Sequence, residues 1–164
     1  MSTSTEDYIA KLESLKSGDL GLLRTHAGHG IDHSSQAFDL FSGLWWPLRE
    51  KSQRAPRREV AWLVAKLYAY RPMQQADTTL AQKMATSQPR TSLTAMKSFR
   101  QRFDQLLMSP LSTIEEPLRW ALDKLPVNST LNWVKLTDDL SIWERESTRL
   151  KWAQEFLTGT KKEE

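Results

Sequence analysis

Residues 131–157 read LNWVKLTDDLSIWERESTRLKWAQEFL, twenty-seven positions without a glycine or a proline. Apolar side chains recur in this stretch at Trp133, Leu136, Leu140, Trp143 and Leu150. Steps of three, four, three and seven are the spacing of one face of an α-helix. The pattern predicts helix here, and it is compatible with one bent helix or with two helices that break near residues 141–146.

Past Trp143, two apolar lines run along the stretch. One continues the first face with Leu150, Ala153 and Leu157. The other lies roughly opposite and contains Trp152, Phe156, Arg145 and Arg149. A helix that is apolar on two sides is normally enclosed between neighbouring elements, and arginines at this spacing can lie over aromatic faces. We therefore expect this stretch to sit at the centre of the core.

Length and composition limit the architecture. The chain has 164 residues, of which 39% are hydrophobic, enough for a real core. We expect one helical domain over residues 1–160, followed by a tail at 161–164. That domain is also compatible with two small halves, 1–75 and 90–160, that share a core. Residues 72–92 are rich in Gln, Thr and Ser and are the best candidate for a mobile connection.

Several classes of protein are excluded by what the sequence lacks. It contains no cysteine, which rules out disulfides and cysteine-ligated zinc and fits a reducing cytoplasm. The N-terminal residues MSTSTEDY show no apolar core of a secretory signal. No apolar run is long enough to cross a bilayer. We expect a cytoplasmic protein without a membrane partner.

The rest of the chain repeats the helical period. Pro47 is expected to end a helix, and Pro56 is expected to lie in the first turn of the next one. The expected helices cover residues 3–15, a short segment after Asp19, residues 35–46, 56–70, 80–84, 93–107 and 112–125. No alternation of period two, the mark of strands, is present where the helical period is strong. The sequence predicts an all-α protein, a compact helical bundle.

Candidate catalytic and metal-binding residues are few. His26, His29, Asp32 and His33 form a cluster, but Gly28 and Gly30 argue against helix there, and no Glu lies between the histidines as a general base. A polar loop without a metal is the better interpretation. The chain has no glycine-rich phosphate loop, no cysteine and no serine in a strained turn. We expect neither catalytic residues nor a cofactor, and the protein is not expected to be an enzyme.

A basic cluster is the sharper signal. Residues 49–58 hold five cations against one acid, Glu50, and follow Trp45 and Trp46 directly. This arrangement combines charges that bind phosphate with rings that can stack on bases, although many such clusters are simply solvated loops. The cations are Arg49, Lys51, Arg54, Arg57 and Arg58. Five further arginines would extend this cluster into a basic groove if the fold brings their helices together with it. They are Arg100, Arg102, Arg119, Arg145 and Arg149.

A family resemblance covers most of the chain. Residues 125–156 resemble the C-terminal signature of the CasB family, the small subunit of the type I-E CRISPR Cascade complex. The matching parts are Leu131-Asn132-Trp133, Asp139-Leu140, Trp143 and Trp152-Ala153-Gln154-Glu155-Phe156. Three further pieces follow the family order, namely Gly18-Asp19-Leu20 through Leu23-Arg24, residues 63–69, and Arg102-Phe103 with Leu106-Leu107. Two departures are Asn132, where the family often has Asp, and the acidic pair Glu115-Glu116.

The resemblance implies a non-catalytic subunit. In the family, two copies lie head to tail along backbone subunits that hold a guide RNA, in a complex with a large subunit. They contact the duplex of guide RNA and target DNA and the displaced strand, and so stabilise the R-loop. By position, Arg57 and Arg102 match basic family residues proposed to face nucleic acid. Arg119 is a looser match. Arg24 also matches a family arginine, and a purely structural role is compatible with that position.

Two other functions are compatible with the residues. One is a free-standing helical DNA-binding regulator, although no helix pair shows a glycine turn followed by an exposed polar recognition face. The other is a helical scaffold whose basic cluster binds an acidic partner surface. Sequence-specific footprinting on a short duplex favours the regulator, and binding to protein alone favours the scaffold.

Overall fold

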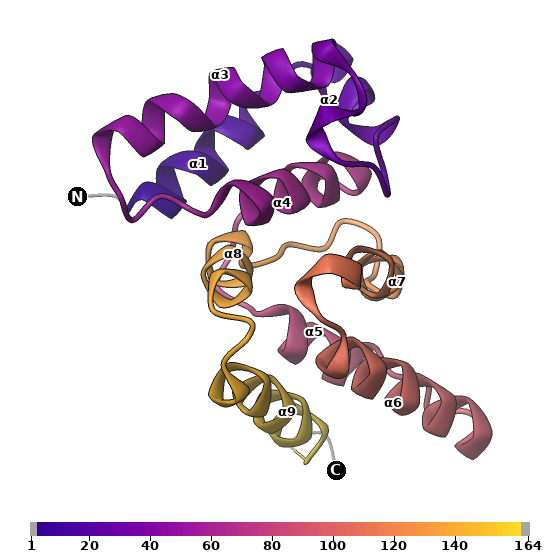
Figure 1. Ribbon diagram of the computed structural model, residues 1–164. Helices are drawn as coiled ribbons and strands as arrows, with labels where there is room; N and C mark the ends of the chain where they lie inside the picture. The colour runs from indigo at the N-terminus through magenta and orange to yellow at the C-terminus, as the bar shows by residue number, and fades with distance from the viewer. Residues whose placement is uncertain (1–2, 162–164) are drawn as a thin grey trace.

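The computed structural model describes residues 3–161. The first half of the chain forms an upper group of helices in Figure 1, in which α1 and α2 lie near the long α3, and α4 closes the group below them. Their bounds are α1 Ser4–Glu13, α2 Ser17–Arg24, α3 Ser35–Lys51 and α4 Arg58–Tyr70, with a short 3-10 turn, η1, at Ile31–His33. Side-chain oxygens of Thr3 and Ser34 cap α1 and α3.

The second half forms a lower group, and α8 lies between the two groups (Figure 1). The bounds are α5 Leu80–Ser87, α6 Leu93–Met108, η2 Leu111–Thr113, α7 Glu115–Asp123, α8 Trp133–Ser141 and α9 Glu146–Lys161. Helix α8 contacts α1 and α4, and α7 also contacts α4. Between residues 3 and 161 the only β pairing is an isolated bridge between Gln75 and Leu131. The prediction of an all-α bundle is confirmed.

Helix α4 is the common neighbour of both groups. It is buried on nearly every side, as its sequence predicts, and even Lys66 in its middle is only 6% exposed. Its contacts include α2 and α3 above and α7 and α8 below. An ammonium group in such a place needs a partner, and the partner comes from the lower group.

The stretch 131–157 folds as two helices that break at residues 142–145. The side chain of Asn132 accepts a hydrogen bond from the backbone N–H of Lys135 and so caps α8. The predicted apolar face is confirmed in α8 and the break, where the buried residues are Trp133, Leu136, Leu140 and Trp143. Both halves of the chain therefore meet around this face.

The expected continuation of that face into α9 is wrong. Leu150 and Leu157 are 55% and 56% exposed, whereas Trp152 and Phe156 are buried. The break shifts the angular phase of the second helix, so the line predicted to lie opposite becomes the core face. Phe156 stacks on Phe103 of α6 with ring centroids 4.4 Å apart.

Helix α9 also packs closely on α5. A Cβ atom at Gly159 would lie 2.7 Å from the Cβ of Ala85, so this contact requires glycine. Helix α5 begins with a capping box between Thr79 and Gln82, and it extends beyond the predicted 80–84. The prediction that residues 72–92 are mobile concerns motion and stays a prediction.

Both proline boundaries differ from the expectation. Pro47 lies inside α3, where it leaves the carbonyl of Gly43 without its helical donor. Gly43 is exposed, so water can satisfy that carbonyl. Pro56 lies before α4, whose first residue is Arg58. Pro117, by contrast, falls in the first turn of α7. Of the expected tail, residue 161 ends α9, and residues 162–164 lie outside the described part.

Within residues 3–161, no helix combines the length and the apolar character needed for a bilayer crossing. This finding agrees with the hydropathy of the sequence. Apolar side chains instead gather in one core that runs through both groups of helices. The single helical domain expected over residues 1–160 stays a prediction, and this shared core is compatible with it.

Candidate nucleic-acid interface

The basic cluster 49–58 spans the end of α3 and the loop that leads to α4. Arg49 is committed to this loop, because its Nη1 donates to the carbonyls of Gln53 at 3.1 Å and Ala55 at 3.0 Å. Trp45 is buried and donates from Nε1 to the carbonyl of Pro56 at 2.7 Å. Lys51 and Arg54 have exposed side chains, and Trp46 is 48% exposed. The loop is thus fixed from inside, with two cations and one indole free to reach solvent.

Arg57 and Arg58 are partly exposed and carry acidic neighbours. The Nη2 of Arg57 lies 3.0 Å from Oε1 of Glu144, and its Nη1 lies 3.7 Å from Glu59. The Nη2 of Arg58 lies 3.9 Å from Oδ1 of Asp32. Its guanidinium also lies over the ring of Phe38, 5.9 Å from the centroid. Both arginine side chains keep 41% of their surface exposed.

The pair Arg57–Glu144 brings the basic loop to the break between α8 and α9. A hydrogen bond from its own backbone, followed by the Arg57 guanidinium, lowers the pKa of Glu144. Arg145 follows directly and is exposed. Arg149 is half-buried, and its Nε is enclosed without a hydrogen-bond partner. The structure therefore gathers the loop cations and the arginines of residues 145–149 into one region, the first basic cluster.

The expectation that Arg145 and Arg149 lie over aromatic rings is wrong. The cation–π contacts within the described residues are made by Arg58, Lys66, Arg102 and Arg119. Arg145 and Arg149 share the line past Trp143 with Trp152 and Phe156, and both of these rings turn into the core. Arg145 is exposed and Arg149 is half-buried, so their guanidinium groups lie outside the rings that the sequence pattern placed beside them.

A second basic cluster lies on α6 and α7, which pack against each other. The guanidinium of Arg102 lies 5.0 Å from the centroid of the Trp120 ring, and that of Arg119 lies 5.8 Å from the Tyr70 ring. Arg100, on the other side of α6, donates from Nε to the amide oxygen of Gln88 at 3.1 Å. The sequence-based prediction did not include Trp120 and Lys124. A Trp and a Lys four positions apart lie on one helix face, so this pair beside Arg119 could have been added to the candidates.

Two hollows are lined in part by residues of η2 and of the first turn of α7. The first, of about 440 Å³, is lined by Glu59, Trp62, Lys66 and Glu115 among others. The second, of about 410 Å³, is lined by Arg102, Gln105, Thr113, Glu116 and Pro117. Acidic side chains therefore lie among the basic ones along this path.

Glu115, one of the two family departures, is turned inward. Its Oε1 lies 2.6 Å from Nζ of Lys66, and its Oε2 accepts from the backbone N–H of Gly28 at 2.9 Å. Lys66 also donates to the carbonyl of His29 at 2.9 Å. One charge of the acidic pair is thereby compensated inside the protein, and only Glu116 points to solvent.

The histidine cluster has a structural explanation. Nδ1 of His26 lies 2.9 Å from the carbonyl of Leu22, and its Nε2 lies 2.9 Å from Oγ of Ser34. The rings of His29 and His33 stack at 4.1 Å. The part of the chain that the structure describes holds no group of three or more metal-ligating side chains. The absence of a bound metal stays a prediction.

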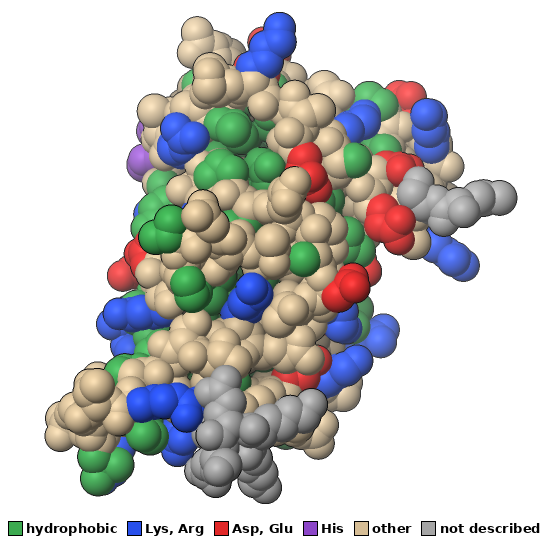
Figure 2. All heavy atoms as spheres, turned by 180° about the vertical axis from the view of Figure 1, so that it is seen from behind, with side chains coloured by type: hydrophobic (Ala, Val, Ile, Leu, Met, Phe, Trp, Pro, Cys, Tyr) green, Lys and Arg blue, Asp and Glu red, His purple; other side chains and the backbone are tan. Residues whose placement is uncertain are grey.

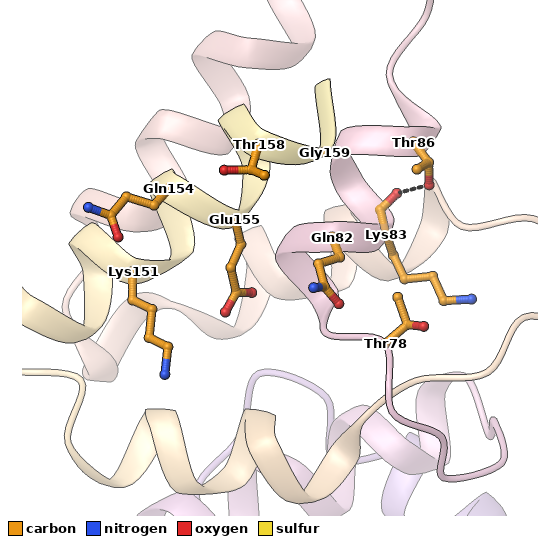
Figure 3. Close-up of a pocket in the computed structure, with 9 residues that line it drawn as sticks. All are labelled: Thr78, Gln82, Lys83, Thr86, Lys151, Gln154, Glu155, Thr158 and Gly159. Carbon is orange, nitrogen blue, oxygen red and sulfur yellow. Dashed lines mark hydrogen bonds between the residues drawn. The ribbon is translucent and has the colours of Figure 1, made fainter. Parts of the chain in front are cut away.

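A hollow of about 580 Å³ lies elsewhere, between α5 and α9 (Figure 3). Lys83 and Lys151 enter it from the two helices, and Glu155 lies between them. Oε2 of Glu155 accepts from the hydroxyl of Thr79 at 2.6 Å. The rest of the lining is made by Thr78, Gln82, Thr86, Gln154, Thr158 and Gly159. None of the ten predicted nucleic-acid residues lines it.

Figure 2 shows the face seen from behind. Lys and Arg side chains are distributed over it and are more frequent in its lower part, to which the lower group of helices belongs. Several acidic side chains lie between them. The formal net charge of +3 agrees with this mixed surface. Local placement therefore matters more than total charge.

The family model of CRISPR-associated protein Cse2 matches residues 19–157. The chain belongs to the Cse2 family. Solved structures similar to this chain carry the name CasB. The recognition made from residue motifs is confirmed. No curated protein sequence matches the chain.

Solved Cse2 and CasB structures have the same fold. A Cse2-family protein from Thermus thermophilus matches with a TM-score of 0.72 at 23% identity, over 96% of this chain and 99% of that one. M. ruber CasB matches with a TM-score of 0.72 at 21% identity, over 98% and 96%. CasB from Thermobifida fusca matches with a TM-score of 0.61 at 17% identity, over 88% and 84%. At these identities the solved structures establish only the fold of this Cse2 protein, and not its activity or partners.

Proposed function

We propose that this Cse2 protein is a non-catalytic small subunit of a type I-E CRISPR Cascade complex. In this role it contacts the duplex of guide RNA and target DNA and the displaced strand, and so stabilises the R-loop. Its partners are the backbone subunits that hold the guide RNA, the large subunit, and a second copy of itself. Family membership over residues 19–157 is the observation that carries the proposal.

The chemistry of the two basic clusters supports the proposal. R-loop formation exchanges one duplex for another of nearly equal stability, so a few protein contacts to the backbone can decide the balance. Such contacts need exposed cations and no apparatus for reading bases. Lys51, Arg54, Arg102 and Arg145 offer exposed cationic side chains of this kind.

The partly exposed ion pairs are compatible with phosphate binding. An exposed pair contributes only about 0–1 kcal/mol, because water and salt screen it. A phosphate can therefore replace Glu144 beside Arg57, or Asp32 beside Arg58, at little cost. Arg49 is the weakest of the ten candidates, since both of its hydrogen bonds hold the loop.

Changing Arg54, Arg57 and Arg102 together to Ala tests the proposal in the assembled complex. The fold is expected to survive, because partly exposed cations contribute little to stability. Target binding is expected to weaken for every guide, and the log–log salt slope is expected to fall by roughly 0.7 to 0.9 for each lost phosphate contact. Gel-shift titrations over a salt series, with complexes that have incorporated the variant, provide the measurement.

The matched control changes Lys83 and Lys151 to Ala, which removes cations from the hollow between α5 and α9. This control is expected to leave affinity and salt slope unchanged. If the triple variant also binds as the parent does, Arg54, Arg57 and Arg102 are not the phosphate contacts, and Arg145 with Arg149 become the next cations to change. A loss confined to one DNA sequence would support the regulator instead.

A further inference from the structure

A further hollow, of about 290 Å³, lies on the side of Arg102 away from Glu116, and we name it the Trp120 hollow. It is lined by Pro89, Ser98, Phe99, Arg102, Trp120 and Lys124, together with Ala95. These residues come from the connection after α5, from α6, and from the end of α7. Its lining contains two cations and no carboxylate, unlike the hollow between α5 and α9, which contains Glu155.

The wall of the Trp120 hollow is built from planar groups in contact. Phe99 supports Trp120 with ring centroids 5.2 Å apart, and the Arg102 guanidinium covers the indole at 5.0 Å. Arg102 is exposed and forms no ion pair with any residue between 3 and 161. A guanidinium that lies over an indole offers its outer face to the next planar group. Unpaired nucleic-acid bases stack on such planes.

The charges around the hollow suit the phosphate that accompanies a base. Lys124 is exposed just past the end of α7. The carboxylate of its neighbour Asp123 is engaged by the hydroxyl of Tyr70, at 2.7 and 2.9 Å. Glu116 lines the hollow on the opposite side of Arg102, not this one. Lys124 is therefore the second cation of the hollow, beside Arg102, and it is available to a phosphate next to the stacked base.

We propose that the Trp120 hollow holds one unpaired base of a nucleic-acid strand. The base stacks on Arg102, which Trp120 supports, and Lys124 contacts an adjoining phosphate. A paired base is already stacked on both sides and does not enter, so the site takes single strands and not duplex. This inference rests on the proposed function and names the ligand of its second basic cluster.

The decisive variant is Arg102→Lys in the full chain, because it keeps the charge and removes the plane. Fluorescence anisotropy is measured with labelled oligothymidine, oligouridine and a hairpin duplex. Affinity for a single strand is expected to fall by at least about fivefold, the lower end of a lost stacking contact, with the salt slope unchanged. Duplex affinity is expected to stay within about twofold, because phosphate contacts do not need the plane.

Two further variants separate stacking from charge. Lys124→Gln is expected to lower the single-strand salt slope by about 0.7. Trp120→Leu is expected to act as Arg102→Lys does. Lys83→Gln is the matched control for Lys124→Gln, since it removes a cation from the hollow between α5 and α9 and is expected to leave binding unchanged. Arg102→Lys and Lys124→Gln change exposed side chains, so they decide the matter even if Trp120→Leu fails to fold.

The outcomes are distinct. Loss with oligothymidine assigns the site to the displaced DNA strand, and loss with oligouridine assigns it to the guide RNA. Unchanged single-strand binding by Arg102→Lys, or an equal loss on the duplex, overturns the inference. The proposed function survives that result if the triple arginine variant still weakens target binding by the complex. If the triple variant also binds normally, the inference about the Trp120 hollow fails, and the proposed function then depends on the result of changing Arg145 and Arg149.

Photocrosslinking locates the base directly. Oligothymidine containing iodouridine is irradiated with the full chain, and the protein is then cut with trypsin. Cleavage after Arg119 and Lys124 releases the peptide WALDK, which contains Trp120. A crosslink on this peptide is expected, and crosslinks confined to the peptide that contains Trp46 overturn the assignment.

Discussion

Two ion pairs join the halves of the molecule, and they differ in burial. Lys66 and Glu115 lie 2.6 Å apart with side chains 6% and 16% exposed. Arg57 and Glu144 lie 3.0 Å apart with side chains 41% and 62% exposed. Both pairs link α4, or its first flanking residue, to the second half of the chain. Only the first is shielded from water.

The difference separates structural charge from available charge. Lys66 cannot reach a ligand, because it is committed to Glu115 and to the carbonyl of His29. Arg57 keeps much of its surface in water and can exchange its carboxylate for a phosphate. A count of basic residues treats the two alike. Burial therefore separates the cations that are available to a ligand from those that hold the fold.

The largest effect is expected at Trp143, the buried neighbour of the exposed Glu144. It is 2% exposed, donates from Nε1 to the carbonyl of Ser109 at 2.8 Å, and meets the Trp152 ring at 5.0 Å. Trp143→Ala is expected to cost about 3–5 kcal/mol, because the cavity left behind cannot collapse fully. Urea unfolding measures the cost. A variant that melts within a degree or two of the parent would contradict the central role of this segment.

Glu115→Ala tests the buried pair. Removing Glu115 leaves the buried Lys66 ammonium with the His29 carbonyl and the Trp62 ring but without a carboxylate, and the expected cost is about 3 kcal/mol. Thermal unfolding followed by circular dichroism provides the measurement. The double variant Lys66→Met with Glu115→Leu is the control, and it is expected to recover most of the lost stability, because no charge is then left unpaired. If the single variant is as stable as the parent, the pair is not structural.

The two helices of residues 131–157 show which part of the fold the sequence predicts and which part it does not. The face through Trp133, Leu136 and Leu140 follows from spacing alone, because one uninterrupted helix keeps its phase. The exposed Leu150 and the buried Trp152 could not be predicted, since four residues of break reset that phase. Periodicity is a local signal, and it does not carry across an irregular segment.

The candidate site shows the same limit. Sequence reasoning found Arg57 and Arg102 from charge and family position, and the structure adds which side chains stand beside them. The partners of Arg57 and Arg102, Glu144 and Trp120, lie far away in the chain, so no spacing rule reveals them. Lys66 was read only as part of an apolar helix, because its partner Glu115 is 49 positions away.

Glu144→Ala probes the exposed pair and is expected to have a small effect. The loss of stability is expected to stay below about 1 kcal/mol, and to shrink further in high salt, because the pair is screened. Urea unfolding at low and high salt measures it. The variant also releases Arg57, so in the assembled complex target binding is expected to be equal to or tighter than that of the parent. A cost like that of Glu115→Ala would mean that burial does not separate the two pairs.

Asp138→Asn is expected to change the free energy of unfolding least, and to raise it, whereas the other variants lower it. Asp138 accepts a hydrogen bond from the Thr5 hydroxyl at 2.7 Å, which joins α8 to α1. Desolvation raises the pKa of Asp138 above its ordinary 3.8, although the Thr5 bond acts to lower it. The folded state therefore holds this proton more tightly than the unfolded state. Ionisation costs stability as the pH rises through the folded pKa, and the cost is absent below the unfolded one.

Asparagine keeps an oxygen acceptor for Thr5 and carries no charge, so Asp138→Asn is expected to be more stable than the parent at neutral pH. The gain is expected to be at most about 0.5 kcal/mol, as for most changes near the surface, and to disappear below about pH 4, where both side chains are neutral. Urea unfolding across this range measures it. Glu144→Gln is the matched control with the opposite slope, because the pKa of Glu144 is lowered and its contribution is lost as the pH falls. An Asp138→Asn variant less stable than the parent at neutral pH would show that the Thr5 bond outweighs desolvation.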